Sequence, residues 1–393
     1  MSKPKIRFKG YEEDWEQRKL EDVVEFLDTM RKPLEGAKRI SGPYPYYGAS
    51  GIVDYVDGYL FDEELILLSE DGANITDRNY PVCFLASGKY WVNNHAHVLR
   101  TKKENENNFI CNSLERKDYT QYNTGMAMPK LNKETCRKIP VLCPVFKEQQ
   151  KIGDYFRSLD RLITLHQRKC EETKKLKKYM LQKMFPQNGE KVPEIRFAGF
   201  SDDWEQRKLG DVLERRIEQR QQSEEYPRLA FASGQGVIPL SERKTNNREQ
   251  LTKDEFTKKY LVTELDDIVY NPANVKYGAI DRNKCGRGLI SPIYVTFTTS
   301  EIPGFIERIV TSHDFQQKAL KFEEGTVTKR QSVNPEDFLT IDIWVARQRE
   351  EQRKISKYFD NLDNLITLHQ WKQKTTEVNS KHQKHNEIIF INI

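Results

Sequence analysis

The sequence predicts an α/β (α+β) protein in which two mixed α/β domains are held apart by two long antiparallel coiled-coil helices, with pseudo-two-fold symmetry. Three observations lead to this expectation: two segments that each occur twice, a heptad-like spacing of apolar residues in one of them, and strand-like runs in the stretches between them. A length of 393 residues suits two or three domains, and 31% charged residues suit long exposed helices.

The repeated segments form a frame around two different inserts. Residues 6–26 return as residues 195–215 with 14 of 21 positions identical, and residues 147–169 return as residues 350–372 with 15 of 23 identical. The stretches between them, residues 27–145 and 216–345, share little. Drift after a duplication would not preserve the frame while erasing the inserts. We therefore interpret the chain as one duplicated unit whose frame stayed constant.

The second repeated segment has the pattern of a long helix. Apolar or small residues recur at alternating steps of four and three from residue 152, and no proline or glycine interrupts residues 154–185. A helix of about 30 residues is roughly 45–50 Å long. Such a stripe cannot be buried alone, so we expect the two copies to pack together in an antiparallel pair. We interpret His166 and His369 as seam positions rather than ligands. The expected seam contains Phe156, Leu159, Ile163, Phe359, Leu362 and Ile366.

Both inserts contain strand-like runs separated by turns. In the first insert these runs are residues 64–68, 82–86, 90–92 and 98–100, and in the second they are residues 228–231, 267–270 and 292–298. Residues 305–322 have helical character. The sequence thus predicts a first domain over residues 1–145, a first helix over 146–188, a second domain over 189–345 and a second helix over 346–380. Residues 381–393 form an atypical tail that lacks the basic, Leu-rich pattern of the first helix.

Motifs for catalysis or for metal binding are missing from the sequence. There is no phosphate-binding Gly-rich loop, and the six cysteines include no C-x-x-C pair, which disfavours disulfides and zinc. His95 and His97 have H-x-H spacing without an assignable third ligand, so we interpret them as a polar strand end. Asn271-Pro-Ala-Asn274 lacks the second proline and the aromatic residue of an amino-methyltransferase loop. We predict no catalytic residue, no metal site and no cofactor in this chain.

Charge and loop composition favour a nucleic-acid partner. The net charge is +5, and residues 147–191 hold twelve Lys or Arg against six Asp or Glu. Arg, Lys, Asn and Gln are the side chains that contact base edges and phosphates, and aromatic residues accompany them here. The sequence shows neither an export signal nor a membrane-spanning run, so we expect the cytoplasm. The candidate DNA-binding residues are Lys89, Tyr90, Trp91, Asn93, Asn94, His95, Asn123, Thr124, Lys130, Asn271, Asn274, Lys276, Tyr277, Arg282, Lys284, Thr328, Lys329, Arg330 and Gln331.

Two doubled motifs resemble those of the specificity subunits of type I restriction-modification systems. One is D-W-E-Q-R-K-L-x-D-V, at residues 14–23 and 203–212, and the other is E-Q-x-K-I-x-x-Y-F-x-x-L-D-x-L-I, at residues 148–163 and 351–366. The stretches from Ser69 to His97 and from Tyr270 to Ile280 are similar to target recognition domains of this family. The resemblance covers nearly the whole chain.

This resemblance implies a non-catalytic subunit that binds double-stranded DNA. Each insert would be a target recognition domain that reads one half of an asymmetric bipartite site. The two helices, with the seam residues named above, would dock two methyltransferase subunits, which would carry S-adenosylmethionine and methylate adenine. Motor and endonuclease subunits would join for cleavage, and no membrane is involved.

Two other classes of function stay open at the level of sequence. A self-contained DNA methyltransferase or nuclease would need a complete catalytic motif, and none is visible. A coiled-coil scaffold that never touches DNA would not need two divergent domains inside one constant frame. Neither the DNA target nor the gap between its halves can be derived from the sequence.

Overall fold

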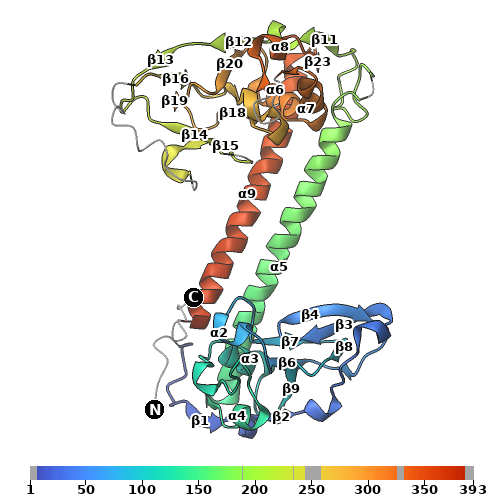
Figure 1. Ribbon diagram of the computed structural model, residues 1–393, viewed down its shortest axis with the longest axis vertical. Helices are drawn as coiled ribbons and strands as arrows, with labels where there is room; N and C mark the ends of the chain where they lie inside the picture. Colours follow the sequence, from blue (N-terminus) through green and yellow to red (C-terminus); the bar gives the residue numbers. More distant parts are fainter. Residues whose placement is uncertain (1–6, 188, 233, 244–257, 325–331, 386–393) are drawn as a thin grey trace. The chain divides into compact units, whose positions relative to one another are not determined.

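The computed structural model describes residues 7–187, 189–232, 234–243, 258–324 and 332–385 (Figure 1). Two compact units are present: Met1–Arg168 with His369–Ile393, and Lys169–Leu368. Each unit contains one α/β domain and parts of two long helices, α5 (Phe146–Lys183) and α9 (Arg349–His385). Among the described helices, none combines the length and the apolar character needed to cross a bilayer.

The first domain is built on two four-stranded sheets and a two-stranded one. The sheet β2-β9-β6-β7 is antiparallel, β4-β3-β8-β5 contains one parallel pair between β3 and β8, and β1 pairs with β10. The elements are β1 (Glu16–Lys19), α1 (Leu20–Val23), β2 (Val24–Phe26), η1 (Asp28–Met30), η2 (Gly36–Lys38), β3 (Ser41–Gly48), β4 (Gly51–Val56), β5 (Phe61–Asp62), β6 (Leu65–Ser69), α2 (Asn74–Asp77), β7 (Cys83–Ala86), β8 (Lys89–Val92), β9 (Ala96–Thr101), α3 (Asn107–Glu115), η3 (Thr120–Tyr122), α4 (Lys133–Arg137) and β10 (Pro140–Cys143).

The second domain contains a similar set of strands and helices. Its largest sheet has the order β12-β20-β17-β18, and a three-stranded sheet has the order β13-β16-β19. The elements are β11 (Glu205–Lys208), η4 (Leu209–Asp211), β12 (Leu213–Arg216), β13 (Gln219–Arg220), β14 (Leu229–Ala232), β15 (Gly236–Pro239), η5 (Leu240–Glu242), β16 (Tyr260–Thr263), β17 (Ile268–Tyr270), η7 (Pro272–Tyr277), β18 (Ile280–Arg282), β19 (Gly288–Ile290), β20 (Val295–Thr299), α6 (Pro303–Val310), α7 (His313–Leu320), β21 (Glu323–Glu324), β22 (Ser332–Val333), α8 (Pro335–Leu339) and β23 (Asp342–Val345).

The two inserts share one sheet design although their sequences share little. Both domains carry an antiparallel four-stranded sheet, with the orders β2-β9-β6-β7 and β12-β20-β17-β18. In each sheet one edge strand is the first of the four in the chain, and it pairs with the strand that comes last in the chain. The predicted strands agree with β6, β7, β8, β9, β14, β17 and β20 to within three residues at either end. The predicted helix over residues 305–322 is divided into α6 and α7. Ser312 causes this division, because its Oγ accepts a hydrogen bond from Phe315 N at 3.1 Å and begins a new helix.

The first frame segment pairs with the strand that leads into the long helix of the same unit. β1 is antiparallel to β10, and β11 is antiparallel to β23 in the same register. A bidentate ion pair seals each pairing: Arg7 binds Glu148 at 2.7 Å, and Arg196 binds Glu351 at 2.6 and 2.9 Å. Both glutamates are fully buried, and a buried carboxylate needs a cationic partner. This need explains why both copies of the frame contain the arginine as well as the glutamate, although the two residues are far apart in sequence.

A glutamine next to each buried glutamate fastens the insert to the frame. The amide oxygen of Gln149 accepts a hydrogen bond from Glu106 N, the N-cap of α3, and that of Gln352 accepts one from Ile302 N, the N-cap of α6, both at 3.1 Å. Each insert also closes on itself where it joins the frame, because Leu20 N donates to Ile139 O and Leu209 N donates to Ile341 O, both at 2.9 Å. The two frames thus share the ion pair, the glutamine hydrogen bond and the closing backbone hydrogen bond.

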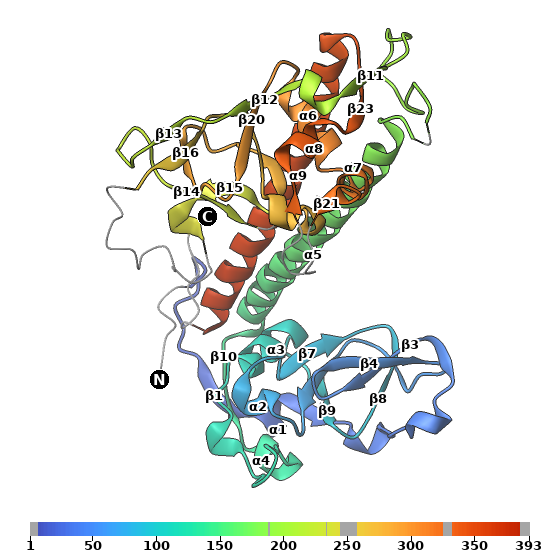
Figure 2. The ribbon, with the colours of Figure 1, turned by 45° about the horizontal axis from the view of Figure 1, so that its top comes forward.

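Within each unit the two long helices lie side by side and run antiparallel (Figures 1 and 2). His166 faces His369 with 3.1 Å between their Nδ1 atoms in the first unit, and Lys177 pairs with Asp363 in the second. This layout of two mixed α/β domains and two long helices confirms the predicted fold class. The second helix extends to His385, beyond the predicted residue 380. Residues 386–393 of the predicted tail lie outside the described part of the chain.

The predicted helix seam needs a correction at its beginning. Phe156 is buried in the core of the first domain together with Trp15, Phe109 and Ile152, because the first turns of α5 pack on their own domain. Phe359 and Leu362 likewise lie in the core of the second domain, where Met184 from the end of α5 joins them. Ile163 and Ile366 are half-buried. In the first turns of each long helix, the apolar stripe therefore packs on the domain of its own unit. Only further along does it face the neighbouring helix.

Candidate nucleic-acid interface

Two loops predicted to contact DNA meet at one end of the first domain. The turn after β6 holds them together: Glu70 N donates to His95 O at 2.8 Å, Leu131 N donates to Glu70 O at 2.7 Å, and Gly72 N donates to Pro129 O at 3.1 Å. Asn93, Asn94 and His95 therefore lie near Asn123, Thr124 and Lys130. We call the loops at residues 69–73, 93–95 and 123–131 the loop platform.

A charged cluster fixes the underside of the loop platform. Arg31 contacts Glu70 at 2.6 Å, Lys130 lies 3.4 Å from the same carboxylate, and His97 contacts Asp28 at 2.8 Å. The Nε2 of His97 also donates to Leu131 O at 2.8 Å, so both ring nitrogens act as donors. Burial is the largest single influence and disfavours the charged imidazole, but the hydrogen bond to Asp28, the contact with Cys136 and the charge of Asp28 together outweigh it and raise the pKa of His97 to about 10.

His95 and His97 do not converge on a common ligand position. His95 precedes β9 and is half-exposed, and its Nδ1 lies 2.8 Å from an oxygen of Asp71, whereas His97 points into the core. Within the described ranges there is no group of three or more His, Cys, Asp or Glu residues placed to hold a metal ion.

Several predicted contact residues on this side are already engaged within the protein. The Oδ1 of Asn93 accepts a hydrogen bond from His95 N, and that of Asn123 accepts two, from Gly125 N and Lys130 N. These two asparagines shape the loops, and Asn93 is buried while Asn123 is half-buried. Tyr90 needs a correction: it is fully buried against Phe61, because the alternation of β8 turns it inward. It cannot contact DNA.

The other face of β8 carries an exposed aromatic and cationic group. Lys89 places its Nζ 4.8 Å from the ring centroid of Tyr59, and Tyr59 packs edge-on against Tyr44 at 5.3 Å. Trp91 lies on the same face of β8, with its indole nitrogen donating to Lys32 O at 2.7 Å. Tyr44 and Tyr59 were missed by the sequence analysis. The tyrosine-rich run over residues 44–59 is the signal that could have found them.

In the second domain, three predicted residues line one hollow. Asn271, Asn274 and Tyr277 surround a cavity of about 530 Å³ together with Phe231 and Tyr294, whose rings stack at 5.8 Å. Asn271 is largely buried and caps η7, since its Oδ1 accepts a hydrogen bond from Ala273 N at 3.0 Å. Lys276 belongs to η7. Thr328, Lys329, Arg330 and Gln331 lie outside the described residues.

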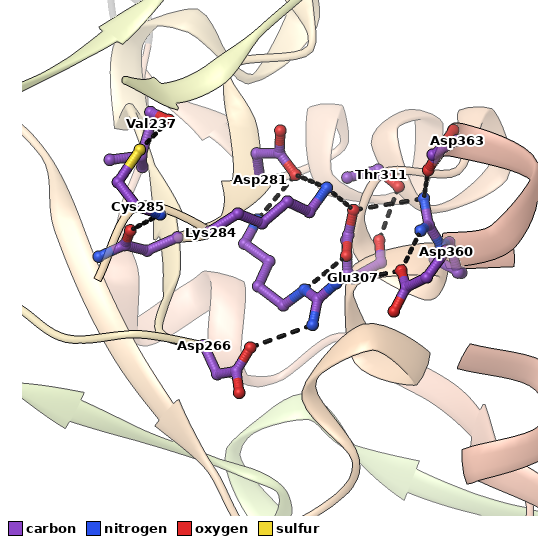
Figure 3. A network of polar contacts seen from close by, with 12 residues as sticks. Val237, Asp266, Asp281, Lys284, Cys285, Glu307, Thr311, Asp360 and Asp363 are labelled. Carbon is purple, nitrogen blue, oxygen red and sulfur yellow. Dashed lines mark hydrogen bonds and ion pairs between the residues drawn. The ribbon is translucent and has the colours of Figure 1, made fainter. Parts of the chain in front are cut away.

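Arg282 and Lys284 belong to a network of ion pairs, in which Arg282 is largely covered and Lys284 stays exposed. Figure 3 shows Lys284 beside Glu307 in this network. Arg282 binds Glu307 at 2.7 Å and Asp360 at 3.1 Å, and Lys284 binds Glu307 at 2.6 Å. Glu307 is only 1% exposed. The sequence analysis missed Glu307 and its neighbour Arg308. Two charges inside the apolar helix segment PGFIERIV were the signal, because buried charges require partners.

Comparison with known proteins finds similarity to one protein family in the first part of the chain. Residues 12–175 match the model of the type I restriction modification DNA specificity domain. A putative type I restriction enzyme specificity subunit of Haemophilus influenzae is 36% identical over 143 residues, which are 36% of each chain. The MjaVIII specificity subunit of Methanocaldococcus jannaschii is 22% identical over 216 residues.

These matched regions span only part of each curated relative, 36% of the first and 50% of the second. A likeness over the full length is found in fold alone. The crystal structure of a type I restriction-modification S subunit from M. genitalium matches with a TM-score of 0.68 at 12% identity, covering 100% of both chains.

Proposed function

We propose that this protein is the DNA-recognition subunit of a type I restriction-modification complex, in which each domain reads one half of an asymmetric bipartite site. One observation carries the proposal: two domains share a sheet design and are attached to a doubled frame by equivalent glutamine hydrogen bonds, yet they present different loops. A constant frame with divergent loops is what a bipartite target requires, because the two half-sites differ in sequence but are held at one spacing.

The accessible side chains of both domains suit DNA. The loop platform offers the exposed Asn94 and Lys130 and the half-buried Asn123, and the neighbouring sheet offers Lys89 beside Tyr59. In the second domain, Asn274 and Tyr277 are exposed beside the hollow over η7. Amide groups pair with base edges and lysines neutralise phosphates, so both kinds of contact are supplied.

The long helices supply a surface for partner subunits. Large apolar side chains are exposed on both: Leu162, Leu165, Leu176 and Tyr179 on α5, and Leu365, Leu368, Trp371 and Val378 on α9. Side chains of this kind mark protein–protein contacts when they gather on one element. We propose that two methyltransferase subunits dock here, with S-adenosylmethionine bound on those subunits, and that motor and endonuclease subunits complete the complex in the cytoplasm. This chain would have no catalytic role.

The docking surface is tested by replacing Leu365 and Leu368 with Asp in the full chain. We expect the methyltransferase subunit to be lost on co-purification, because two charges would be buried in an apolar interface. The matched control replaces the exposed Asn361 and Asn364 with Asp, which adds the same charge to the same helix. Equal retention of the partner by both variants would contradict docking at these leucines.

Partition of the target is tested by replacing residues 27–145 with the insert of another family member. Methylated adenines are then mapped in a host whose only other methyltransferase component is the partner subunit. We expect one half of the target to change and the other to stay. A change in both halves would refute the two-domain model. The alternative of a self-contained methyltransferase or nuclease finds no support in the comparisons.

A further inference from the structure

The first turns of α5 and α9 are nearly identical in sequence but differ where they touch their domains. The frame aligns Gly153 with Ser356 and Arg157 with Asp360, while the apolar positions around them are the same: Ile152 with Ile355 and Phe156 with Phe359. We call Gly153 with Arg157 the first socket, and Ser356 with Asp360 the second socket. These differences in charge and side-chain size match differences between the two domains.

The charge of each socket is opposite to that of the domain seated on it. In the first unit, Arg157 lies 3.2 Å from Glu106 and 3.4 Å from Glu64. In the second unit, Asp360 lies 2.8 Å from Arg308 and 3.1 Å from Arg282. One frame position therefore carries a cation facing two acids in one copy, and an acid facing two cations in the other.

The sizes at the neighbouring position are complementary as well. A Cβ on Gly153 would overlap a carboxylate oxygen of Glu106, so a side chain in the first socket would displace that carboxylate from its present place. In the second unit the order is reversed, because a Cβ on Gly304 would lie 2.1 Å from the Oγ of Ser356. In the second unit the side chain therefore belongs to the socket, as Ser356, and the glycine belongs to the domain, as Gly304.

Two equivalent hydrogen bonds show that these positions correspond. Gln149 binds the N-cap of α3 and Gln352 binds the N-cap of α6, so Glu106 corresponds to Ile302 and Asn108 to Gly304. Asn108 uses its larger side chain to donate to Gly153 O at 2.7 Å. Between the two units, the domain and the socket therefore change together, in charge and in side-chain size. The glutamine hydrogen bonds between domain and frame are equivalent in both units.

We propose that each socket is selective for its own class of domain. The first accepts a domain that presents acids and a bulky residue at the second position of its docking helix, and the second accepts one that presents arginines and a glycine there. This inference concerns how a domain is held, and it is independent of what the domain reads. An incoming domain of the wrong class would meet like charges, and burying like charges together costs folding free energy.

A transplant within the full chain tests the selectivity. Residues 20–139 replace residues 209–341, either on the natural second helix or on one carrying Ser356→Gly and Asp360→Arg. Hydrogen exchange of the transplanted strands is measured in both chains. We expect protection to be at least tenfold weaker on the natural helix, because Glu64 and Glu106 would face Asp360. Equal protection in the two chains would overturn the proposal.

Point variants keep the proposal testable if neither transplant folds. Arg157→Asp should lower the midpoint of thermal unfolding of the first domain by several degrees, and adding Glu64→Arg should restore part of the loss. The matched control is Arg161→Asp, the same change on an exposed face of α5 one turn further on. If the two single variants lower the midpoint equally, the socket has no selective charge and the proposal fails.

Discussion

At the scale of single residues, His97 makes the stability of the first domain depend on pH. Its pKa is raised from about 6.5 in an unfolded chain to about 10 in the buried pair with Asp28. A raised pKa means that the folded state holds a proton that the unfolded state has already lost. The stabilisation is therefore complete below about pH 6.5, and it disappears as the pH rises toward 10.

The measurement is thermal unfolding of the first domain at several pH values from 7 to 10. We expect the midpoint to fall over this range in the natural protein and to fall much less in His97→Gln, which has no proton to lose. His95→Gln serves as the control, because His95 is exposed and should leave the slope unchanged. If the unfolding midpoint of His97→Gln falls with pH as steeply as that of the natural protein, another titrating group causes the pH dependence.

The buried pair of Arg7 and Glu148 gives a second prediction at this scale. Glu148 is fully buried, so Arg7→Met would leave its charge without a partner and cost about 3–5 kcal/mol of unfolding free energy. Arg7→Met with Glu148→Met should cost clearly less, because no charge is then stranded. Denaturant unfolding measures both. A double variant as unstable as the single one would show that the pair acts through its shape and not through its charge.

At the scale of elements, the length of the paired helices should set the gap between half-sites. Four extra residues add about 6 Å and leave a residual rotation of about 40°, whereas one residue turns everything beyond it by about 100°. Duplicating residues 173–176 in α5 and residues 365–368 in α9 keeps His166 opposite His369 and Lys177 opposite Asp363. We expect both half-sites to be retained and the gap to grow by about one or two base pairs.

Methylation mapping of the matched duplication measures the gap. Duplicating residues 173–176 in α5 alone serves as the comparison, because it shifts one helix against the other and should weaken methylation. Full activity of the matched variant at an unchanged gap would mean that another feature sets the distance.

Elements were the part of the structure that the sequence predicted best, because their signals are local. The spacing of apolar residues along α5 and the hydrophobic run of β6 depend only on neighbours in the chain. The orientation of Tyr90 was missed because alternation fixes which residues share a face, not which face is inside. The partners of Arg282 were missed because Glu307 and Asp360 are 25 and 78 residues away. The sheet that the two inserts share could not be predicted, because many different apolar sequences can form the same sheet.

At the scale of the whole molecule, the purified chain should bind DNA without modifying it. We expect methyl transfer to DNA only after the methyltransferase subunit is added, because both the cofactor and the chemistry would reside there. The assay measures transfer of a labelled methyl group from S-adenosylmethionine, with the chain alone, the partner alone and both together. Transfer by the chain alone, free of the partner, would contradict the assignment of catalysis to another subunit.

The closure of each insert at Leu20 with Ile139, and at Leu209 with Ile341, has a consequence for the gene. Both ends of a variable region leave the frame at one point, and each end is flanked by coding sequence that occurs twice. A crossover in those repeats would move a complete cassette and leave the protein's scaffold intact. New targets would then arise by recombination in one step rather than by gradual substitution, with the two sockets deciding which cassettes survive the exchange.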